Sequence, residues 1–344
     1  MYQRTSYSEA TANVWLSLRL QLLAAMIISF VAVTAVFKTN RNLGSPGLVG
    51  LALSYATPMV TLMGNFLSSF SETEKEMVSV ERIMEYLGVP QEDLRADQSV
   101  DETWPTRGAV EFRNVTMRYA TSPSPSLNSV SFIINGGSKV GIVGRTGAGK
   151  SSILNSLFCI SPICNGYILI DGIDINKIPA RVVRKSMAIV PQCPFLFEGS
   201  LRDNLDPFGK LSDASIWSAL EKCQIKEAAE LIGGIDKETG SSFSVGQKQL
   251  ICLARALLLD TKILCLDECT ANVDSKMAEV IVTTIETACE GVTIITIAHR
   301  ISTVMNLDDV FVLEHGNLVE KGNPGELLRD FNSIFFSLAE ASTM

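Results

Sequence analysis

The chain has 344 residues, of which 47% are hydrophobic, and its mean hydropathy of +0.24 is high for a soluble protein, so membrane spans are considered first. Its formal net charge of -8, from 29 basic and 37 acidic residues, argues against a nucleic-acid binder, which needs a basic stripe. The eight cysteines form no C-x-x-C pair and only two histidines occur, which argues against a zinc site and a disulfide framework.

Two long apolar runs stand near the N-terminus. Residues 20–37 and 47–70 carry no charge, and the polar residues 38–46 join them. A helix needs about 20 apolar residues to cross the hydrocarbon core of a bilayer, so we expect a transmembrane hairpin with spans at about 18–37 and 47–70. Arg19 would lie at the inner end of the first span, where it can snorkel. A signal peptide is disfavoured because a second span follows, whereas a pair of buried soluble helices stays open as the alternative.

A polar-to-amphipathic segment follows the second run. Residues 71–89 place apolar side chains three or four apart, which predicts a helix that leads out of the membrane. The next stretch, 90–108, is polar with prolines near both ends and is typical of a linker. The expected organisation is therefore a membrane part (1–89), a linker (90–108) and a larger domain (109–344).

The larger domain has an α/β pattern. Apolar strand-like runs occur first at 110–119, 130–134 and 140–143, the last two separated by the strong turn signal Asn135-Gly136-Gly137. Later strand candidates are 187–190, 263–266 and 292–298, with helical stretches between them. This alternation predicts a largely parallel sheet covered by helices.

A phosphate-binding loop follows the run at 140–143. The residues Gly144, Arg145, Thr146, Gly147, Ala148, Gly149, Lys150 and Ser151 fit the pattern G-x-x-x-x-G-K-[ST], with a predicted helix at 152–159 after it. Glycines let backbone N–H groups turn toward phosphate oxygens at a helix N-terminus. Lys150 would neutralise the β- and γ-phosphates, and the Ser151 hydroxyl could ligate Mg²⁺. The flanking strand and helix make this motif specific.

Two adjacent carboxylates end the apolar run at 263–266. Asp267 at this strand end would hold the metal through water, and Glu268 would polarise the attacking water. Alone, the pattern fits equally well a strand capped by solvated acids. Its position after the phosphate loop favours the functional interpretation.

Between these motifs, Phe243-Ser-Val-Gly-Gln-Lys-Gln-Leu250 resembles the signature of ABC ATPases. The other motifs of that family occur in the family order. Gln192 is similar to the Q-loop glutamine, Asp274 to the D-loop aspartate, and His299 to the switch histidine. Tyr119 resembles the aromatic residue that stacks on adenine. Six ordered motifs together make the resemblance highly specific.

The form of the motifs resembles the multidrug-resistance-associated, or C, subfamily. The segments 243–247, 264–274 and 296–304 are similar to the second nucleotide-binding domain of that subfamily, in a version that resembles plant members. The segments 45–55 and 77–83 resemble its last membrane helix and the exit from it. The resemblance therefore covers nearly the whole chain and identifies it with the C-terminal portion of such a transporter, including the last two membrane helices.

The resemblance implies a P-loop NTPase fold of the ABC type, with a mixed sheet, a helical subdomain and an antiparallel β part. It also implies ATP and Mg²⁺ as cofactors. The implied catalytic residues are Glu268, His299 and Gln192, and the implied metal-binding residues are Ser151, Gln192 and Asp267. ATP would further be held by Tyr119, residues 144–151 and Ser152. ABC domains act as head-to-tail pairs, so Ser244, Gly246 and Gln247 would face the ATP of a second ABC domain.

The function implied is ATP hydrolysis that drives export of organic anions or conjugates through a membrane. The expected partners are the lipid bilayer, a second nucleotide-binding domain and the remaining membrane helices, with no nucleic acid. The chain would be a multi-pass membrane protein with a cytosolic ATPase domain, in the vacuolar or the plasma membrane. Alternatives are an ATP-gated channel or regulator, a soluble ABC ATPase of translation or DNA repair, and a fragment that binds ATP but needs a partner to hydrolyse it. Residues 234–240 are shorter than the family pattern, which would alter coupling to the membrane part.

Overall fold

The computed structural model divides the chain into two compact units, Met1–Glu92 and Asp93–Met344. The residues that it describes are 2–40, 46–89, 92, 100–101, 103–120, 122–238, 243–271, 273–298 and 300–343.

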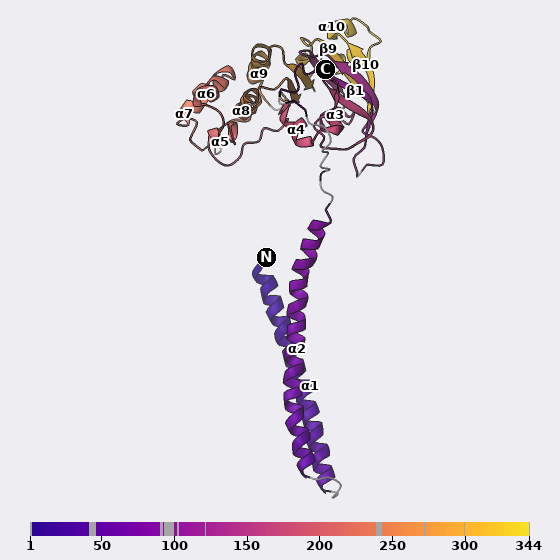
Figure 1. Cartoon of the computed structure of the whole chain (residues 1–344), viewed down its shortest axis with the longest axis vertical. Coiled ribbons are helices and arrows are strands. Elements are labelled where there is room, and N and C mark those ends of the chain that lie inside the picture. The colour runs from indigo at the N-terminus through magenta and orange to yellow at the C-terminus, as the bar shows by residue number, and fades with distance from the viewer. Residues whose placement is uncertain are drawn as a thin grey trace. The chain divides into compact units, whose positions relative to one another are not determined.

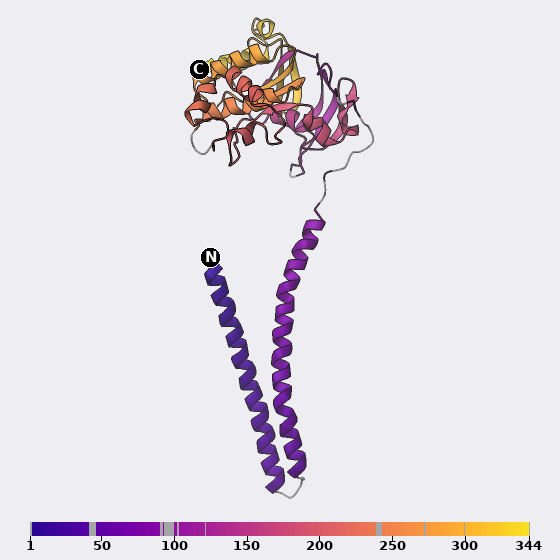
Figure 2. The same ribbon diagram turned by 60° about the vertical axis from the view of Figure 1, so that its left-hand side comes forward.

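The first unit is a helical hairpin. Helix α1 (Tyr2–Asn40) and helix α2 (Pro46–Leu87) run alongside each other in opposite directions (Figure 2). Among the described residues, one stretch, Val14–Phe37 in α1, is long and apolar enough to cross a membrane. The span predicted at 47–70 lies within α2 and stays a prediction. The helix predicted at 71–89 forms the C-terminal part of α2, which continues without a break to Leu87, and its role as an exit from the membrane stays a prediction.

The second unit contains two sheets. The smaller one has the strand order β2-β1-β4-β5 and is antiparallel. Its strands are β1 (Val110–Met117), β2 (Leu127–Ile134), β4 (Ile163–Ile170) and β5 (Ile173–Asp174). The larger sheet has the order β10-β9-β3-β8-β7-β6 and is parallel except for the pair β9 and β10. The strands of this mixed sheet are β3 (Lys139–Gly144), β6 (Ala188–Val190), β7 (Ile263–Asp267), β8 (Thr293–Ile297), β9 (Asp309–Glu314) and β10 (Asn317–Gly322).

The predicted mixed sheet and antiparallel part are therefore confirmed. The turn at Asn135–Gly137 also forms, but it joins strands of different sheets: β2 pairs with β1, and β3 pairs with β8 and β9. The turn between β9 and β10 is tight, with His315 and Gly316 both at positive φ. His315 therefore lies in the hairpin turn, as predicted, and the N–H of the next residue, Gly316, donates to the carbonyl oxygen of Ala148 in the phosphate loop at 3.0 Å.

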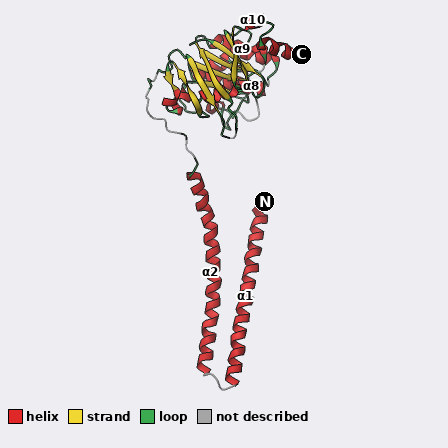
Figure 3. Cartoon of the chain, turned by 90° about the vertical axis from the view of Figure 1, so that its right-hand side faces the viewer, coloured by secondary structure: helices red, strands yellow, loops and turns green. Residues whose placement is uncertain are grey.

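Helices cover the mixed sheet and extend beyond it (Figures 1 and 3). Figure 1 shows α5 to α8 gathered on one side of the unit, as the helical subdomain that the resemblance implied. The helices are α3 (Lys150–Leu157), α4 (Ala180–Lys185), α5 (Leu201–Leu205), α6 (Asp213–Lys222), α7 (Lys226–Leu231), α8 (Val245–Leu258), α9 (Ser275–Ala288), α10 (Pro324–Leu327) and α11 (Ile334–Thr343), with single 3-10 turns at Ile175–Lys177 and Ile301–Thr303.

Three hydrophobic clusters build the core of this unit. The first fills the space between the two sheets, with Phe112, Leu157 and Phe311 among its fully buried members. The second lies on the opposite face of the mixed sheet under α6, α8 and α9. The third lies on that same opposite face over β3 and β9, and includes Phe335 of α11. Because side chains alternate along a strand, each parallel strand contributes to both faces, which explains why its sequence is apolar throughout.

Candidate functional site

The phosphate loop joins the end of β3 to the start of α3, as predicted. Gly149, the N-cap of α3, has a φ of 101°, and a Cβ at this position would lie 2.5 Å from the carbonyl oxygen of Ser126. Only glycine fits both constraints. No side chain caps α3. The first N–H groups of a helix lack partners within the helix, so its N-terminus favours a bound anion such as phosphate.

Lys150 lies under this loop. Its side chain is 7% exposed, and its Nζ donates to the carbonyl oxygens of Gly144 (2.8 Å) and Arg145 (3.3 Å). Burial lowers the pKa of Lys150, while the charges of Glu268 and Asp267 act in the opposite direction. The loop thus carries a preplaced ammonium group next to two carboxylates.

The two carboxylates lie at the carboxyl end of β7. Burial raises the pKa of Asp267, the charge of Glu268 raises it further, and Lys150 opposes both. Glu268 adopts a left-handed φ of 48°, and its N–H donates to the carbonyl of Ile297 at the end of the neighbouring strand. Gln192 reaches the same place from beyond β6, where its Nε2 donates to a Glu268 carboxylate oxygen at 2.7 Å. Ligands of open α/β sheets bind at this edge, outside the carboxyl ends of the strands.

Tyr119 also lies beside the phosphate loop. Its hydroxyl is 3.2 Å from Ser152 Oγ in α3, and it accepts a hydrogen bond from Asn155 Nδ2 at 2.8 Å. The ring is half-buried against the first hydrophobic cluster. This position beside α3 is compatible with the predicted adenine contact, which stays a prediction.

The signature residues lie elsewhere. Ser244 is the N-cap of α8 and forms a complete capping box with Gln247: Ser244 Oγ accepts from the Gln247 N–H, and the Ser244 N–H donates to Gln247 Oε1. Gly246 allows α8 to approach α9 closely, since a Cβ there would lie 3.0 Å from Met277 Cγ. Figure 1 shows α8 and α3 in different parts of the unit, so the structure does not bring the signature to its own phosphate loop.

One polar residue of the signature helix was not predicted from the sequence to have a role. Gln249 is 2% exposed, and its Nε2 donates to the carbonyl of Pro191, immediately before Gln192. It therefore ties α8 to the segment that carries Gln192. The available signal was a glutamine on the core-facing side of an amphipathic helix, where a buried amide needs a partner.

The two remaining residues that the family resemblance predicted are Asp274 and His299. Asp274 is the exposed N-cap of α9, and its side chain makes no capping hydrogen bond. His299 follows β8 but lies outside the described residues.

Comparison with known proteins agrees with this arrangement. Residues 127–271 match the family model described as ABC transporter. Over 99% of its length, the chain is 58% identical to the ABC transporter C family member 13 of Arabidopsis thaliana. The chain belongs to the ABC transporter family.

Other members of this family show the same relationship. The chain is 42% identical to the ATP-binding cassette sub-family C member 10 of Mus musculus and 41% identical to the metal resistance protein YCF1 of Saccharomyces cerevisiae, over 99% and 96% of its length. It spans about a quarter of these relatives: 25% of the Arabidopsis protein, 23% of the mouse protein and 22% of the yeast protein. The predicted relationship to the C subfamily is thereby confirmed, and a plant protein is among the similar relatives.

A solved structure supports the fold independently. A bacterial Atm1-family ABC exporter with ATP bound matches 96% of this chain and 58% of its own, with a TM-score of 0.73 and 27% identity. The predicted fold class and the nucleotide-binding domain of ABC type are therefore confirmed.

Proposed function

We propose that this chain is the C-terminal portion of a C-subfamily ABC transporter, in which binding and hydrolysis of ATP drive the export of organic anions or conjugates. The observation that carries the proposal is the convergence of Lys150, Asp267, Glu268 and Gln192 beside the uncapped N-terminus of α3. A buried ammonium, two carboxylates and a helix N-terminus without a side-chain cap match the needs of phosphoryl transfer, which are positioning and charge stabilisation.

The site fits ATP and Mg²⁺. Gly149 lets the loop pack against the carbonyl oxygen of Ser126, α3 begins without a side-chain cap that would occupy the place of a phosphate, and Lys150 stands at the base of the loop. Ser151, Gln192 and Asp267 carry the hydroxyl, amide and carboxylate oxygens that Mg²⁺ prefers, and they would hold it. When bound, Mg²⁺ neutralises charge on the phosphate oxygens.

The residues of the chain then divide the work of hydrolysis. Glu268 accepts a proton from the attacking water or orients it, and the hydrogen bond from Gln192 holds its carboxylate in place. Lys150 stabilises negative charge at the β- and γ-phosphates. We assign His299 to the γ-phosphate and the water on its sequence position alone.

A second ABC domain completes the proposed site. Ser244 is exposed at the start of α8, and Figure 1 shows α8 in a different part of the unit from α3, which follows the phosphate loop. We therefore propose that Ser244, Gly246 and Gln247 face the ATP of the partner domain. This chain alone would bind ATP and hydrolyse it only after pairing.

The helical hairpin is the proposed membrane part. Val14–Phe37 exposes its apolar side chains along most of its length, as a lipid-facing helix does. Since ATP is cytosolic, the ATPase domain would lie in the cytosol and residues 38–46 on the opposite side of the membrane. The proposed partners are the bilayer and the remaining membrane helices.

Coupling between the two parts is proposed to run through the helical subdomain. Gln249 fixes α8 to Pro191, and the exposed Phe195 and Phe197 pack edge to face a few residues further on. Arg255 of α8 lies over the Phe197 ring at 5.7 Å. An exposed aromatic pair that contacts the signature helix is a suitable docking surface for the remaining membrane helices of a complete transporter.

The test is transport by the complete protein in inside-out vesicles, with a glutathione or glucuronide conjugate as substrate. We expect ATP-dependent uptake and conjugate-stimulated ATP hydrolysis, both of which are lost in Glu268→Gln. Hydrolysis that no conjugate stimulates, together with absent uptake, would contradict the proposed transport function. Ion currents gated by ATP without uptake would favour a channel.

A further inference from the structure

A groove lies on the face of the mixed sheet that carries the second and third hydrophobic clusters. The alternate residues Ile294 and Thr296 of β8, and Ala298 immediately after it, point to this face. Ile294 belongs to the cluster under α8 and α9, and Ala298 belongs to the cluster that includes α11. Thr296 lies between them and is partly exposed, although β8 is paired on both sides. The two covering layers therefore fail to meet over the middle of β8.

The neighbours of Thr296 show why this gap exists. On β3 its partner is Gly141, where a Cβ would lie 2.6 Å from Val304 Cγ1. The segment around Val304, which covers this part of the sheet, therefore packs closely against β3. On β7 its partner is Leu266, which packs into the cluster under α8 and α9. Each layer is held against its own strand, and the strand between them stays open.

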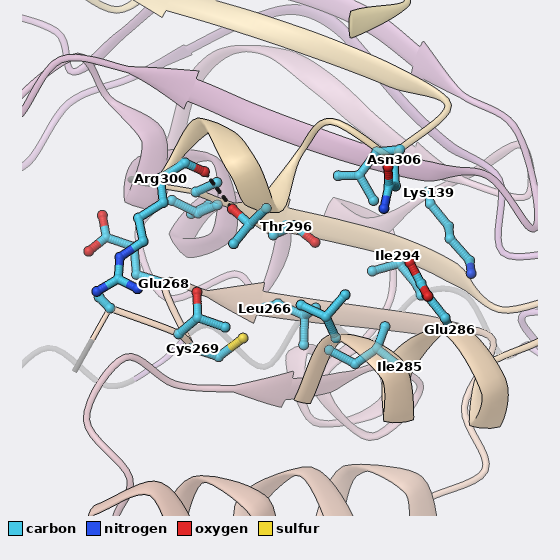
Figure 4. Close-up of a pocket in the computed structure, with 17 residues that line it drawn as sticks. Lys139, Leu266, Glu268, Cys269, Ile285, Glu286, Ile294, Thr296, Arg300 and Asn306 are labelled. Atoms are coloured by element: carbon cyan, nitrogen blue, oxygen red, sulfur yellow. Dashed lines mark hydrogen bonds between the residues drawn. The ribbon is translucent and has the colours of Figure 1, made fainter. Parts of the chain in front are cut away.

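The residues that line the groove follow β8 and gather at its two ends, which we call its mouths (Figure 4). From Ile294 to Ala298 its floor covers four residue steps, or about 13 Å at the rise of a strand. Its middle is mainly apolar, with Leu266, Ile285 and Cys269 on the walls. It includes none of the phosphate-loop residues 144–152 among those that line it.

Each mouth combines one basic and one acidic residue. Lys139, Asn306 and Glu286 stand at one end, and Arg300 and Glu268 at the other. Neither mouth therefore has a formal charge that would select an anion or a cation, whereas the apolar middle favours transfer of an apolar body from water.

We propose that this groove is a binding site for a small, uncharged, mainly apolar molecule. Such a ligand would lie against β8, with the Thr296 hydroxyl as a polar contact at the centre and its ends at the two mouths. An apolar pocket with a few placed polar groups is the usual form of a small-molecule site. An occupant would contact the segment 266–271, which carries Glu268, from the side opposite the phosphate loop.

Photolabelling with benzophenone tests the site directly. Benzophenone is uncharged, consists of two rings and inserts into nearby C–H bonds on illumination. The full chain in lipid nanodiscs is illuminated, and adducts are mapped by mass spectrometry. We expect adducts within 266–271, 282–286 and 294–307, with additional adducts on α1 from probe dissolved in lipid. Because this readout needs no ATP turnover, failure of the site and failure of the proposed function are distinguishable.

Two filling variants and one matched control complete the design. Thr296→Trp fills the groove from its floor, and Val282→Trp fills it from α9, where the half-buried side chain tolerates added volume. Each should lower labelling of the groove peptides about tenfold, because displacing a packed indole is costly. Ile133→Trp, on an exposed position of β2, should leave it unchanged. If Thr296→Trp fails to fold, as judged by MgATP binding, Val282→Trp decides.

Three results would overturn the proposal. Adducts confined to α1 would show that the groove binds nothing, and undiminished labelling of the filled variants would place the probe elsewhere. The third result concerns ligand charge. The carboxylate 4-benzoylbenzoate should label no more strongly than benzophenone, and stronger labelling that is abolished by Arg300→Gln would identify an anion site instead.

Discussion

Helices α3 and α8 both begin at a family motif, but only α8 has a side chain that caps its N-terminus. Helix α3 starts at Gly149 with no side-chain cap, whereas α8 starts at Ser244 with a capping box that is closed by Gln247. The four N–H groups at a helix start need acceptors, and those of α8 find part of theirs within the chain. The difference indicates that the N-terminus of α3 is free to bind an anion that is not part of the protein. The N-terminus of α8 is already stabilised by its own side chains.

The largest expected effect is on ATP turnover at the site beside α3. Glu268→Gln should reduce ATP turnover about 10²- to 10⁴-fold, the usual contribution of a general base, while MgATP still binds. Turnover and equilibrium binding are measured on the same preparation. Glu286→Gln is the matched control, since Glu286 lies on α9 at the far mouth of the groove, and it should retain turnover. Equal turnover in wild type and Glu268→Gln would remove Glu268 from the mechanism.

The next effect is on nucleotide affinity. Lys150→Met should weaken MgATP binding about 10- to 150-fold, since a hydrogen bond to a charged group contributes about 1.5–3 kcal/mol. Lys139→Met, at the opposite end of β3, should bind MgATP as the wild type does. Equilibrium binding of a fluorescent ATP analogue measures both. If the two variants lost the same affinity, the phosphate would not lie at the α3 terminus.

A third group of backbone N–H donors differs from both helix starts, because its anion is a carboxylate of the protein itself. The Asp171 carboxylate accepts from the backbone N–H groups of residues 106–109 at 2.8–3.2 Å. Burial raises the pKa of Asp171, but the four backbone hydrogen bonds together lower it below its ordinary value. Asp171→Asn should therefore cost about 1–2 kcal/mol of the free energy of unfolding at neutral pH.

The sign of the pH dependence follows from the lowered pKa. The contribution of Asp171 is fully present above its unfolded pKa of about 3.9, and it is lost as the pH falls through the lower folded pKa. Chemical unfolding at pH 7 and below pH 4 measures it. The difference between wild type and Asp171→Asn should shrink across this window, and a difference that grows on acidification would contradict the assignment.

The smallest expected effect is at the cap of α8. Ser244→Ala should cost about 1 kcal/mol of the free energy of unfolding and leave MgATP binding to this domain unchanged, while turnover of the paired domains falls. Ser212→Ala removes the N-cap of α6 and should cost a similar free energy without affecting turnover. If both variants kept full turnover, Ser244 would only cap α8 and would have no role at the ATP of a partner domain.

The sequence predicted the parallel strands and the phosphate loop well, because both depend on local patterns. Residues 140–143, 263–266 and 292–298 are apolar throughout, as strands buried on both faces must be, and they form β3, β7 and β8. The turn at 135–137 was equally local, yet it could not show that the flanking strands enter different sheets. Sheet membership depends on distant partners such as β8 and β9.

The contacts within the site were harder to predict. The pattern placed Lys150, Asp267, Glu268 and Gln192 in one site, but it gave no sign that Gln192 would donate to Glu268 or that Lys150 would bind the loop carbonyls. Asp171 and Gln249 were not predicted because their partners are backbone groups far away in the sequence; the position of Gln249 on the core-facing side of α8 indicates a need for a partner, but the sequence does not show which one.

The central claim is that α3 binds ATP within this chain whereas α8 serves a partner domain. The most direct measurement is steady-state ATP turnover by the purified chain across a range of protein concentrations, with Glu268→Gln beside the wild type. We expect turnover that rises more steeply than linearly with concentration, because pairing supplies α8 to each phosphate loop, and no turnover in the variant. Turnover per chain that stays constant down to the lowest concentration would mean that one domain is sufficient, and that α8 is not needed by a partner domain.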